Sequence, residues 1–238
     1  MILAVLQARM SSTRLPGKVL MPIVRAPMII RQIERVARSR RIDKLVVATS
    51  TDPLDDAIEA AVRRDGVAVH RGPLDNVLER FVGALDAHPA DHVVRLTADC
   101  PLADPSVIDA TIDLHLSSGA DYTSNSPEGS AFPKGLDVEV ITAAGLRRAA
   151  AQADSPEARE HVTWDVWNNP DRWNLAWLSD APGEAAVRWT VDRPDDYAFV
   201  AAVYDALYPN NRAFTSDDVR AFVKGREDLL NYGGDRRA

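Results

Sequence analysis

The stretch that decides the fold is ILAVLQARMSSTRLPGK, residues 2–18. Its first five residues are apolar, which predicts a strand buried on both faces, as in a parallel sheet. The polar loop that follows carries three cations and three hydroxyls, and these groups can line a concave anion site together with backbone N–H groups. Pro16 and Gly17 predict a turn that returns Lys18 to this site. The opening residues therefore predict a polyphosphate site at the end of a core strand.

Strand and helix patterns alternate along the first half of the chain. The apolar runs predict further strands at 44–49, 67–70 and 92–97. Helical spacing or start signals predict helices at 27–39, from Asp52-Pro53 onward, at 73–87, and from Asp104-Pro105 to about 117. Strand–helix units in series indicate an α/β protein with a mostly parallel sheet and helices on both of its faces.

The regular alternation of strand and helix patterns ends after Gly119. Strands are predicted at 120–124, 135–142, 173–178 and 187–191, and helices at 143–153, 156–168, 193–207 and 215–225. We interpret residues 1–238 as one domain, in which 119–187 form a less regular lobe over the carboxyl edge of the sheet. The tail 233–238 is predicted to be frayed.

Composition limits the class of protein. With 238 residues and 46% hydrophobic content the chain can bury a sizeable core. No run of eighteen apolar residues predicts a membrane span, and no signal peptide is recognised. The single cysteine, Cys100, fits a reducing compartment. We therefore expect a cytoplasmic protein without a membrane partner.

Charge is distributed unevenly. The net charge is −7, which argues against general nucleic-acid binding. Residues 1–41, however, hold nine lysines and arginines and one acid. We interpret the five arginines within 31–41 as the solvated face of a helix, and favour binding roles for Arg9, Arg14 and Lys18. A local basic block on an acidic protein suits a small anionic ligand.

Polar residues follow each predicted parallel strand, where ligands of open α/β sheets bind. Asp99 comes directly after the strand at 92–97, and a carboxylate there can hold Mg²⁺ opposite a polyphosphate. Its alternative role, a helix N-cap, falls better to Asp104. Asp192 has a similar placement, and a metal ligand and a cap are equally good interpretations of it.

The second lobe offers candidates for a second substrate. Asp137 and Glu139 share one face of their predicted strand because side chains alternate. Arg159 and Thr163 are four residues apart on the helix predicted at 156–168, so they can line a cleft together. A solvated helix face explains the same spacing equally well.

Several stretches together resemble one known family. They are QARMSSTRLPGKVL (7–20), VVATSTDPLDDAI (46–58), VVRLTADCPLADP (93–105), FPKGLDVEVIT (132–142) and RWTVDRPDDY (188–197). The chain resembles the spore coat polysaccharide biosynthesis protein F family, which belongs with cytidylyltransferases such as the CMP-Kdo and CMP-acylneuraminate synthetases. The resemblance implies a three-layer, Rossmann-like nucleotide-diphospho-sugar transferase fold of the glycosyltransferase-A type, with a mixed, mostly parallel sheet.

The resemblance also implies a reaction and a set of site residues. CTP and a small acidic acceptor would give a CMP-acceptor and pyrophosphate, with Mg²⁺ as cofactor and a homodimer as the assembly. The implied catalytic residues are Arg14, Lys18 and Asp99, and the implied metal ligands are Asp99 and Asp192. The implied nucleotide-binding residues are Gln7, Ala8, Arg9, Ser12, Thr49, Ser50, Asp52, Arg71 and Asn76. The candidate acceptor-binding residues are Lys134, Glu139, Arg159, Thr163 and Arg188.

The acceptor is left open between a sugar acid and a phosphonate. Trp164, Trp167 and Trp189 depart from the family pattern, and a smaller, drier pocket built from them favours a compact acceptor such as a small phosphonate. Core or dimer contacts are the alternative role, above all for Trp167. Two other functions also stay open: a glycosyltransferase on the same fold and a non-catalytic nucleotide-binding subunit.

Overall fold

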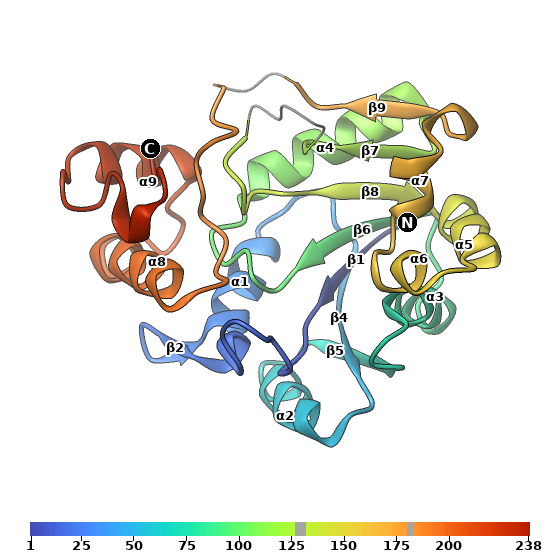
Figure 1. Ribbon diagram of the computed structural model, residues 1–238, viewed down its shortest axis with the longest axis horizontal. Helices are drawn as coiled ribbons and strands as arrows, with labels where there is room; N and C mark the ends of the chain where they lie inside the picture. Colours follow the sequence, from blue (N-terminus) through green and yellow to red (C-terminus); the bar gives the residue numbers. More distant parts are fainter. Residues whose placement is uncertain (127–131, 180–182) are drawn as a thin grey trace.

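A seven-stranded sheet runs through the computed structural model, which describes residues 1–126, 132–179 and 183–238 (Figure 1). From edge to edge its strands are β5 (Ala68–Gly72), β4 (Lys44–Ser50), β1 (Ile2–Gln7), β6 (His92–Thr97), β8 (Glu139–Thr142), β7 (Tyr122–Ser124) and β9 (Leu175–Trp177). Strand β8 pairs antiparallel with both of its neighbours, β6 and β7, and the other pairings in this sheet are parallel. The predicted mixed, mostly parallel sheet is confirmed.

The interior strand β1 is buried on both faces. Ile2, Ala4 and Leu6 join one hydrophobic core, and Leu3 and Val5 join a second core on the opposite face. Such two-sided burial is what the unbroken apolar run of this strand predicts, because successive side chains point to opposite faces. The molecule is therefore built in three layers.

Helices cover each face of the sheet. The first core is closed by α1 (Met28–Val36), α2 (Asp56–Arg64), α4 (Pro105–Ser118), α8 (Pro194–Leu207) and α9 (Ser216–Lys224). The second core is closed by α3 (Val77–Ala87), α5 (Ala143–Gln152) and α7 (Trp164–Asn168), and α6 (Pro156–Glu160) packs beside α3. A two-stranded ribbon of β2 (Pro22–Ile23) and β3 (Ala26–Pro27) precedes α1. In the part of the chain that the structure describes, no helix combines the length and the apolar character needed to cross a membrane.

The segment 119–187 extends the same sheet. It supplies β7, β8 and β9 beyond β6, and it also supplies α5, α6 and α7. The helix predicted at 156–168 is wrong in one respect, since the chain forms two short helices with a turn between them. The turn directs Val162 into the second core and lets the Thr163 hydroxyl donate to Glu139 on β8.

The strand predicted at 187–191 is also wrong, although its core pattern is right. Val187, Trp189 and Val191 are fully buried, but the backbone here bonds to several unrelated segments instead of one strand. Gly135 allows the closest of these approaches, because a side chain there would meet the Thr190 nitrogen at 2.7 Å and its φ is +113°.

Two of the arginines interpreted as a solvated face are buried. Arg31 donates to the Ile23 carbonyl, and Arg35 donates to the carbonyls of Ala103 and Phe214. Their guanidinium groups donate to backbone carbonyls, and such hydrogen bonds make a buried cation tolerable. Only Arg40 and Arg41 of the five fit the predicted exposed face among the described residues.

The tail is anchored, which contradicts the predicted fraying. The Arg237 side chain is fully buried, and its guanidinium lies 2.8 Å from the equally buried carboxylate of Asp196 on α8. It also donates to the carbonyls of Arg188 and Tyr232, and the Trp189 indole donates to the Arg237 carbonyl. This ion pair joins the last residues of the chain to the start of α8.

Replacing this cation should destabilise the fold. We expect Arg237→Met to lower the free energy of unfolding by about 3 kcal/mol, the lower end of the range for a broken buried pair, because Arg188 still bonds to Asp196. Urea unfolding measures the change. Arg236→Met is the matched control, since the Arg236 side chain is exposed. Equal midpoints for the two variants would contradict the assigned role of Arg237.

Candidate nucleotide site

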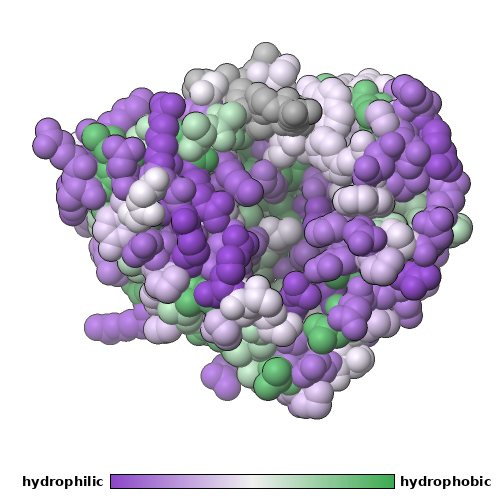
Figure 2. Space-filling model, viewed as in Figure 1, coloured by the Kyte–Doolittle hydropathy of each residue, from purple (hydrophilic) through white to green (hydrophobic). Residues whose placement is uncertain are grey.

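A cavity of about 380 Å³ opens at the carboxyl ends of β1 and β6. Figure 2 shows a hollow in the middle of the viewed face with hydrophilic residues around it. The cavity is lined by Gln7, Ala8, Arg9, Ser12, Thr13, Arg14, Lys18, Val19, Val77, Arg80, Arg95, Thr97, Ala98, Asp99, Glu160, His161 and Asp192. The structure thus brings the loop after β1, the end of β6 and the start of α8 to one site.

The loop after β1 forms the turn that the sequence predicts. Gly17 adopts a φ of +73°, in the left-handed region that favours glycine, and its N–H donates to the Met10 carbonyl. A short 3₁₀ helix, Lys18–Leu20, begins directly after it. The turn directs the Lys18 side chain inward, where the residue is only 8% exposed.

Lys18 is the centre of the site. Its ammonium donates to the Asp192 carboxylate at 3.0 Å and to the Val191 carbonyl at 2.6 Å, and lies 3.4 Å from the Asp99 carboxylate. One cation therefore joins the strand end of β6 to the segment before α8. A buried ammonium needs such partners, because desolvation without them is costly.

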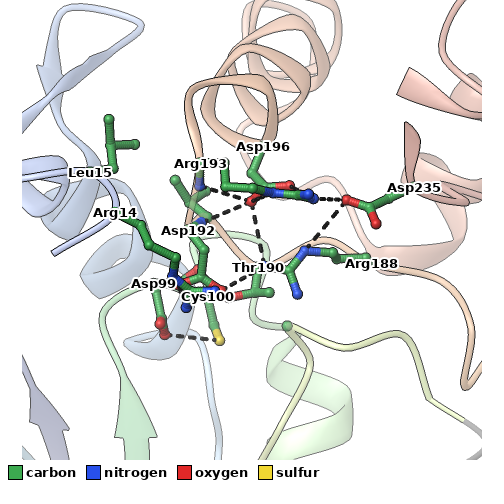
Figure 3. A network of polar contacts seen from close by, with 12 residues as sticks. Arg14, Leu15, Asp99, Cys100, Arg188, Thr190, Asp192, Arg193, Asp196 and Asp235 are labelled. Atoms are coloured by element: carbon green, nitrogen blue, oxygen red, sulfur yellow. Dashed lines mark hydrogen bonds and ion pairs between the residues drawn. The ribbon is translucent and has the colours of Figure 1, made fainter. Parts of the chain in front are cut away.

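Asp192 is surrounded by positive charge. Arg14 lies 2.9 Å from one of its oxygens and Arg188 lies 2.6 Å from the other. Burial alone would raise the pKa of Asp192, but the hydrogen bonds and charges of Lys18, Arg188 and Arg14 outweigh burial and lower it. Figure 3 shows this carboxylate between Arg14 and the network around Asp196. Asp192 is not the cap of α8, because Arg193 occupies that position.

The Asp99 carboxylate is more exposed than that of Asp192 and lies farther from the Lys18 ammonium. The Thr97 hydroxyl donates to one of its oxygens at 2.6 Å, while the other faces Lys18 at the longer distance of 3.4 Å. The side chain is 29% exposed, against 10% for Asp192. The N-cap role that was the alternative interpretation of Asp99 belongs to Asp104. Its side chain accepts from the Ser106 N–H at the start of α4, as predicted.

The two carboxylates fit a magnesium site that phosphate completes. Mg²⁺ binds oxygen ligands, and in nucleotide enzymes one or two carboxylates combine with substrate phosphates and water. Asp99 and Asp192 supply carboxylate oxygens that both lie beside the Lys18 ammonium. No group of three or more histidine, cysteine, aspartate or glutamate side chains that could hold a metal occurs in the described residues.

Asp55 holds the loop in place, and the sequence reasoning missed it. It is 1% exposed, accepts from Met10 N–H at 2.7 Å, and accepts from both the N–H and the hydroxyl of Ser50. The carboxylate thus ties the end of β4 to the loop after β1. A buried aspartate within an N-terminal helical turn gave no separate signal in the sequence.

A second cavity, of about 330 Å³, adjoins the first. It is lined by Arg95, Glu139, His161, Thr163, Trp164, Trp167 and Asn168. The two tryptophans are 37% and 39% exposed, and the Trp164 ring stacks on His161 with centroids 5.9 Å apart. Trp189, in contrast, is a fully buried core residue, so it forms no wall of this pocket.

Five of the predicted nucleotide-binding residues lie outside both linings. Thr49 and Ser50 are buried, Asp52 caps the 3₁₀ turn at Pro53–Asp55, and Asn76 caps α3. The Arg71 guanidinium pairs with Asp56 and Glu59 on α2. The side chains of Ser50, Asp52, Arg71 and Asn76 have structural partners, whereas the buried Thr49 hydroxyl has none among the described residues. A role of these five residues toward the base or ribose stays a prediction.

The candidate acceptor residues divide in a similar way. Glu139 and Thr163 line the second cavity, whereas Lys134, Arg159 and Arg188 line neither. Arg188 lies within the Asp192–Asp196 network. Arg159 is exposed on α6, and the break before α7 explains why it does not share a face with Thr163. Helical spacing is no guide across two separate helices.

Four polar residues that line the first cavity had not been singled out for it. Arg80, Arg95, Glu160 and His161 all line the first one. A signal existed for Arg95, because Arg95, Thr97 and Asp99 are alternate polar positions along an otherwise apolar segment. Arg80 gave no such signal; it is 1% exposed and donates to the carbonyls of Pro73 and Leu74.

Comparisons with known proteins agree with this geometry. A family model described as cytidylyltransferase matches residues 3–163. The spore coat polysaccharide biosynthesis protein SpsF of Bacillus subtilis is 37% identical over 213 residues, which cover 85% of this chain and 86% of that protein. A cytidylyltransferase structure from Leptospira borgpetersenii superposes with a TM-score of 0.91 at 27% identity, over 96% of each chain.

The fold extends to more distant structures. CMP:2-keto-3-deoxy-manno-octonic acid synthetase complexed with CTP gives a TM-score of 0.66 at 21% identity, over 86% of this chain and 98% of that one. At that identity the likeness concerns the fold, and it supports the implied nucleotidyltransferase architecture. Taken with the family match over residues 3–163, it leads to one conclusion: the chain belongs to the cytidylyltransferase family and is a nucleotidyltransferase.

Proposed function

We propose that this enzyme binds CTP with Mg²⁺ in the first cavity and transfers CMP to a small acidic acceptor, a sugar acid or a phosphonate, in the second. Pyrophosphate is the other product. The observation that carries this proposal is the Lys18 ammonium between Asp99 and Asp192, beside Arg14, at the strand ends of the first cavity. CTP in the related synthetase structure and the family match support the choice of nucleotide.

The triphosphate fits the basic end of the cavity. Lys18 and Arg14 come from the loop after β1, and both already contact a carboxylate that phosphate oxygens can replace as their partner. Ser12 and Thr13 supply hydroxyl donors in the same lining. Mg²⁺ held by Asp99 and Asp192 would neutralise phosphate charge and favour departure of pyrophosphate. The remaining contribution of the chain is to hold the nucleotide in line with the acceptor.

The acceptor site is supported by the second cavity. Its aromatic walls and its polar groups, among them Glu139 and Thr163, adjoin the nucleotide cavity at Arg95 and His161. A compact acceptor placed there lies next to the transferred phosphoryl group. Homodimer formation and a cytoplasmic location, both expected from the sequence, stay predictions.

The first prediction for this function concerns turnover. Lys18→Ala and Asp99→Ala should each lower turnover by about 10²–10³-fold, the loss typical when one electrostatic contact to the transition state is removed. The assay measures pyrophosphate release from CTP with nonulosonic acids, Kdo and small phosphonates as acceptors. Arg41→Ala is the control, because Arg41 is exposed and pairs with Asp113 outside the cavity. Near-normal rates in both site variants would refute the assignment.

A second prediction concerns binding without an acceptor. In the presence of Mg²⁺, CTP should raise the melting temperature more than ATP, GTP or UTP, since a ligand at 100 times its Kd stabilises the native state by about 2.7 kcal/mol. Removing the metal with EDTA should reduce this shift, and Lys18→Ala should abolish most of it. Equal shifts with all four nucleotides would count against a cytidine-specific site.

A further inference from the structure

Arg95 lies where the two cavities meet. It and His161 are the side chains that line both of them. His161 is exposed at the end of α6, whereas the Arg95 side chain comes from the central strand β6 and is only 16% exposed. A cation fixed on the sheet at this junction is well placed to contact whatever group passes from one ligand to the other.

The guanidinium is held in one orientation. Its Nε donates to the Gln7 amide oxygen at 3.2 Å, and its Nη1 donates to Glu139 at 2.5 Å. Glu139 is fixed in turn, because its second oxygen accepts from the Thr163 hydroxyl at 2.7 Å. Among the described residues, Nη2 has no hydrogen-bond partner. Two nitrogens of Arg95 thus position the side chain, and the third is available for a ligand.

Three polar residues between 95 and 99 indicate which ligand lies at which end of the first cavity. Arg95, Thr97 and Asp99 all line the first cavity. Arg95 and Thr97 belong to β6, and Asp99 lies in the turn that follows it, so Arg95 and Asp99 are at opposite ends of this row. Asp99 contacts Lys18 at the end proposed for the departing phosphates, and Arg95 borders the acceptor cavity at the other end.

In an in-line displacement the transferred phosphorus lies between the attacking and the leaving oxygens. An acceptor in the second cavity and pyrophosphate beside Lys18 therefore place the α-phosphate near the junction. During transfer an acceptor oxygen forms a bond to the α-phosphorus; a phosphonate oxygen is already anionic, and a sugar hydroxyl passes its proton to solvent water as the bond forms. The bond from that phosphorus to the β-phosphate oxygen breaks, and its electron pair leaves with pyrophosphate.

We infer that Arg95 is a catalytic residue whose Nη2 donates to a non-bridging oxygen of the CTP α-phosphate. This inference rests on the proposed function, because it needs CTP in the first cavity. It distinguishes Arg95 from Lys18 and Arg14, which contact the departing phosphates. Arg95 should therefore contribute to the binding of any nucleotide that has an α-phosphate, with or without the β- and γ-phosphates.

Calorimetric titration with cytidine, CMP and CTP tests the assignment without an acceptor. Arg95→Met should weaken CMP and CTP by a similar factor of about 10, the loss expected for one hydrogen bond to a charged group, and leave cytidine unchanged. Lys18→Met should weaken CTP strongly and CMP little. The contrast between the two variants separates the α-phosphate from the departing phosphates.

Two further variants keep the result interpretable. Arg95→Met leaves the Glu139 carboxylate without its cation, so Arg95→Met/Glu139→Gln removes both charges together. Arg147→Met is the matched control, because Arg147 is exposed and pairs with Asp86 away from both cavities. Should both Arg95 variants fail to fold, a crystal structure of the unmodified enzyme with CMP decides by whether Nη2 lies within hydrogen-bond distance of the phosphate.

Unchanged CMP affinity in the folded Arg95 variants, or a phosphate out of reach of Nη2, would overturn the inference. In that case the proposed function could still hold, since the unmodified enzyme would bind CTP. If the unmodified enzyme binds no CTP at all, the proposed function itself fails. The two failures are distinguishable because the second is seen before any residue is replaced.

Discussion

The hydrogen bonds and ion pairs of the Lys18 ammonium determine the shape of the site. Lys18 reaches Asp99 at the end of β6 and Asp192 before α8, so a loop near the start of the chain and a segment near its end are joined through one atom. Asp192 stays ionised because three cations surround it. These groups satisfy one another in the structure, and in the proposed function phosphate enters by exchanging partners with Arg14 and Lys18. The cost of opening the site is thereby reduced.

The parts of the structure that depend on near neighbours could be predicted from the sequence. The apolar run of β1, the turn at Gly17 and the cap at Asp104 are each specified within a few residues, and each forms as expected. The mostly parallel sheet follows from the alternation of such units. Asp99 could be placed at the cleft because the carboxyl ends of parallel strands meet at one edge of the sheet. Asp192 reaches the same cleft although the strand predicted before it does not form.

Features that depend on distant contacts could not be predicted. The break between α6 and α7 lets Thr163 bond to Glu139, which is far away in the sequence. Arg31 and Arg35 have a helical spacing that fits solvent exposure equally well, and their burial depends on carbonyls of other segments. Arg237 is buried because it forms an ion pair with the buried Asp196, and no local sequence pattern reveals that pairing.

The buried Arg237 has a consequence for synthesis on the ribosome. Asp196 orders the segment that carries Asp192, through the backbone N–H groups of Asp192 and Arg193, and Arg237 neutralises Asp196. Lys18 and Arg14 are translated long before residue 237, so the basic side of the site precedes a residue that helps to order its acidic side. A nascent chain still short of residue 237 therefore lacks one of the contacts that hold the segment around Asp192 in place.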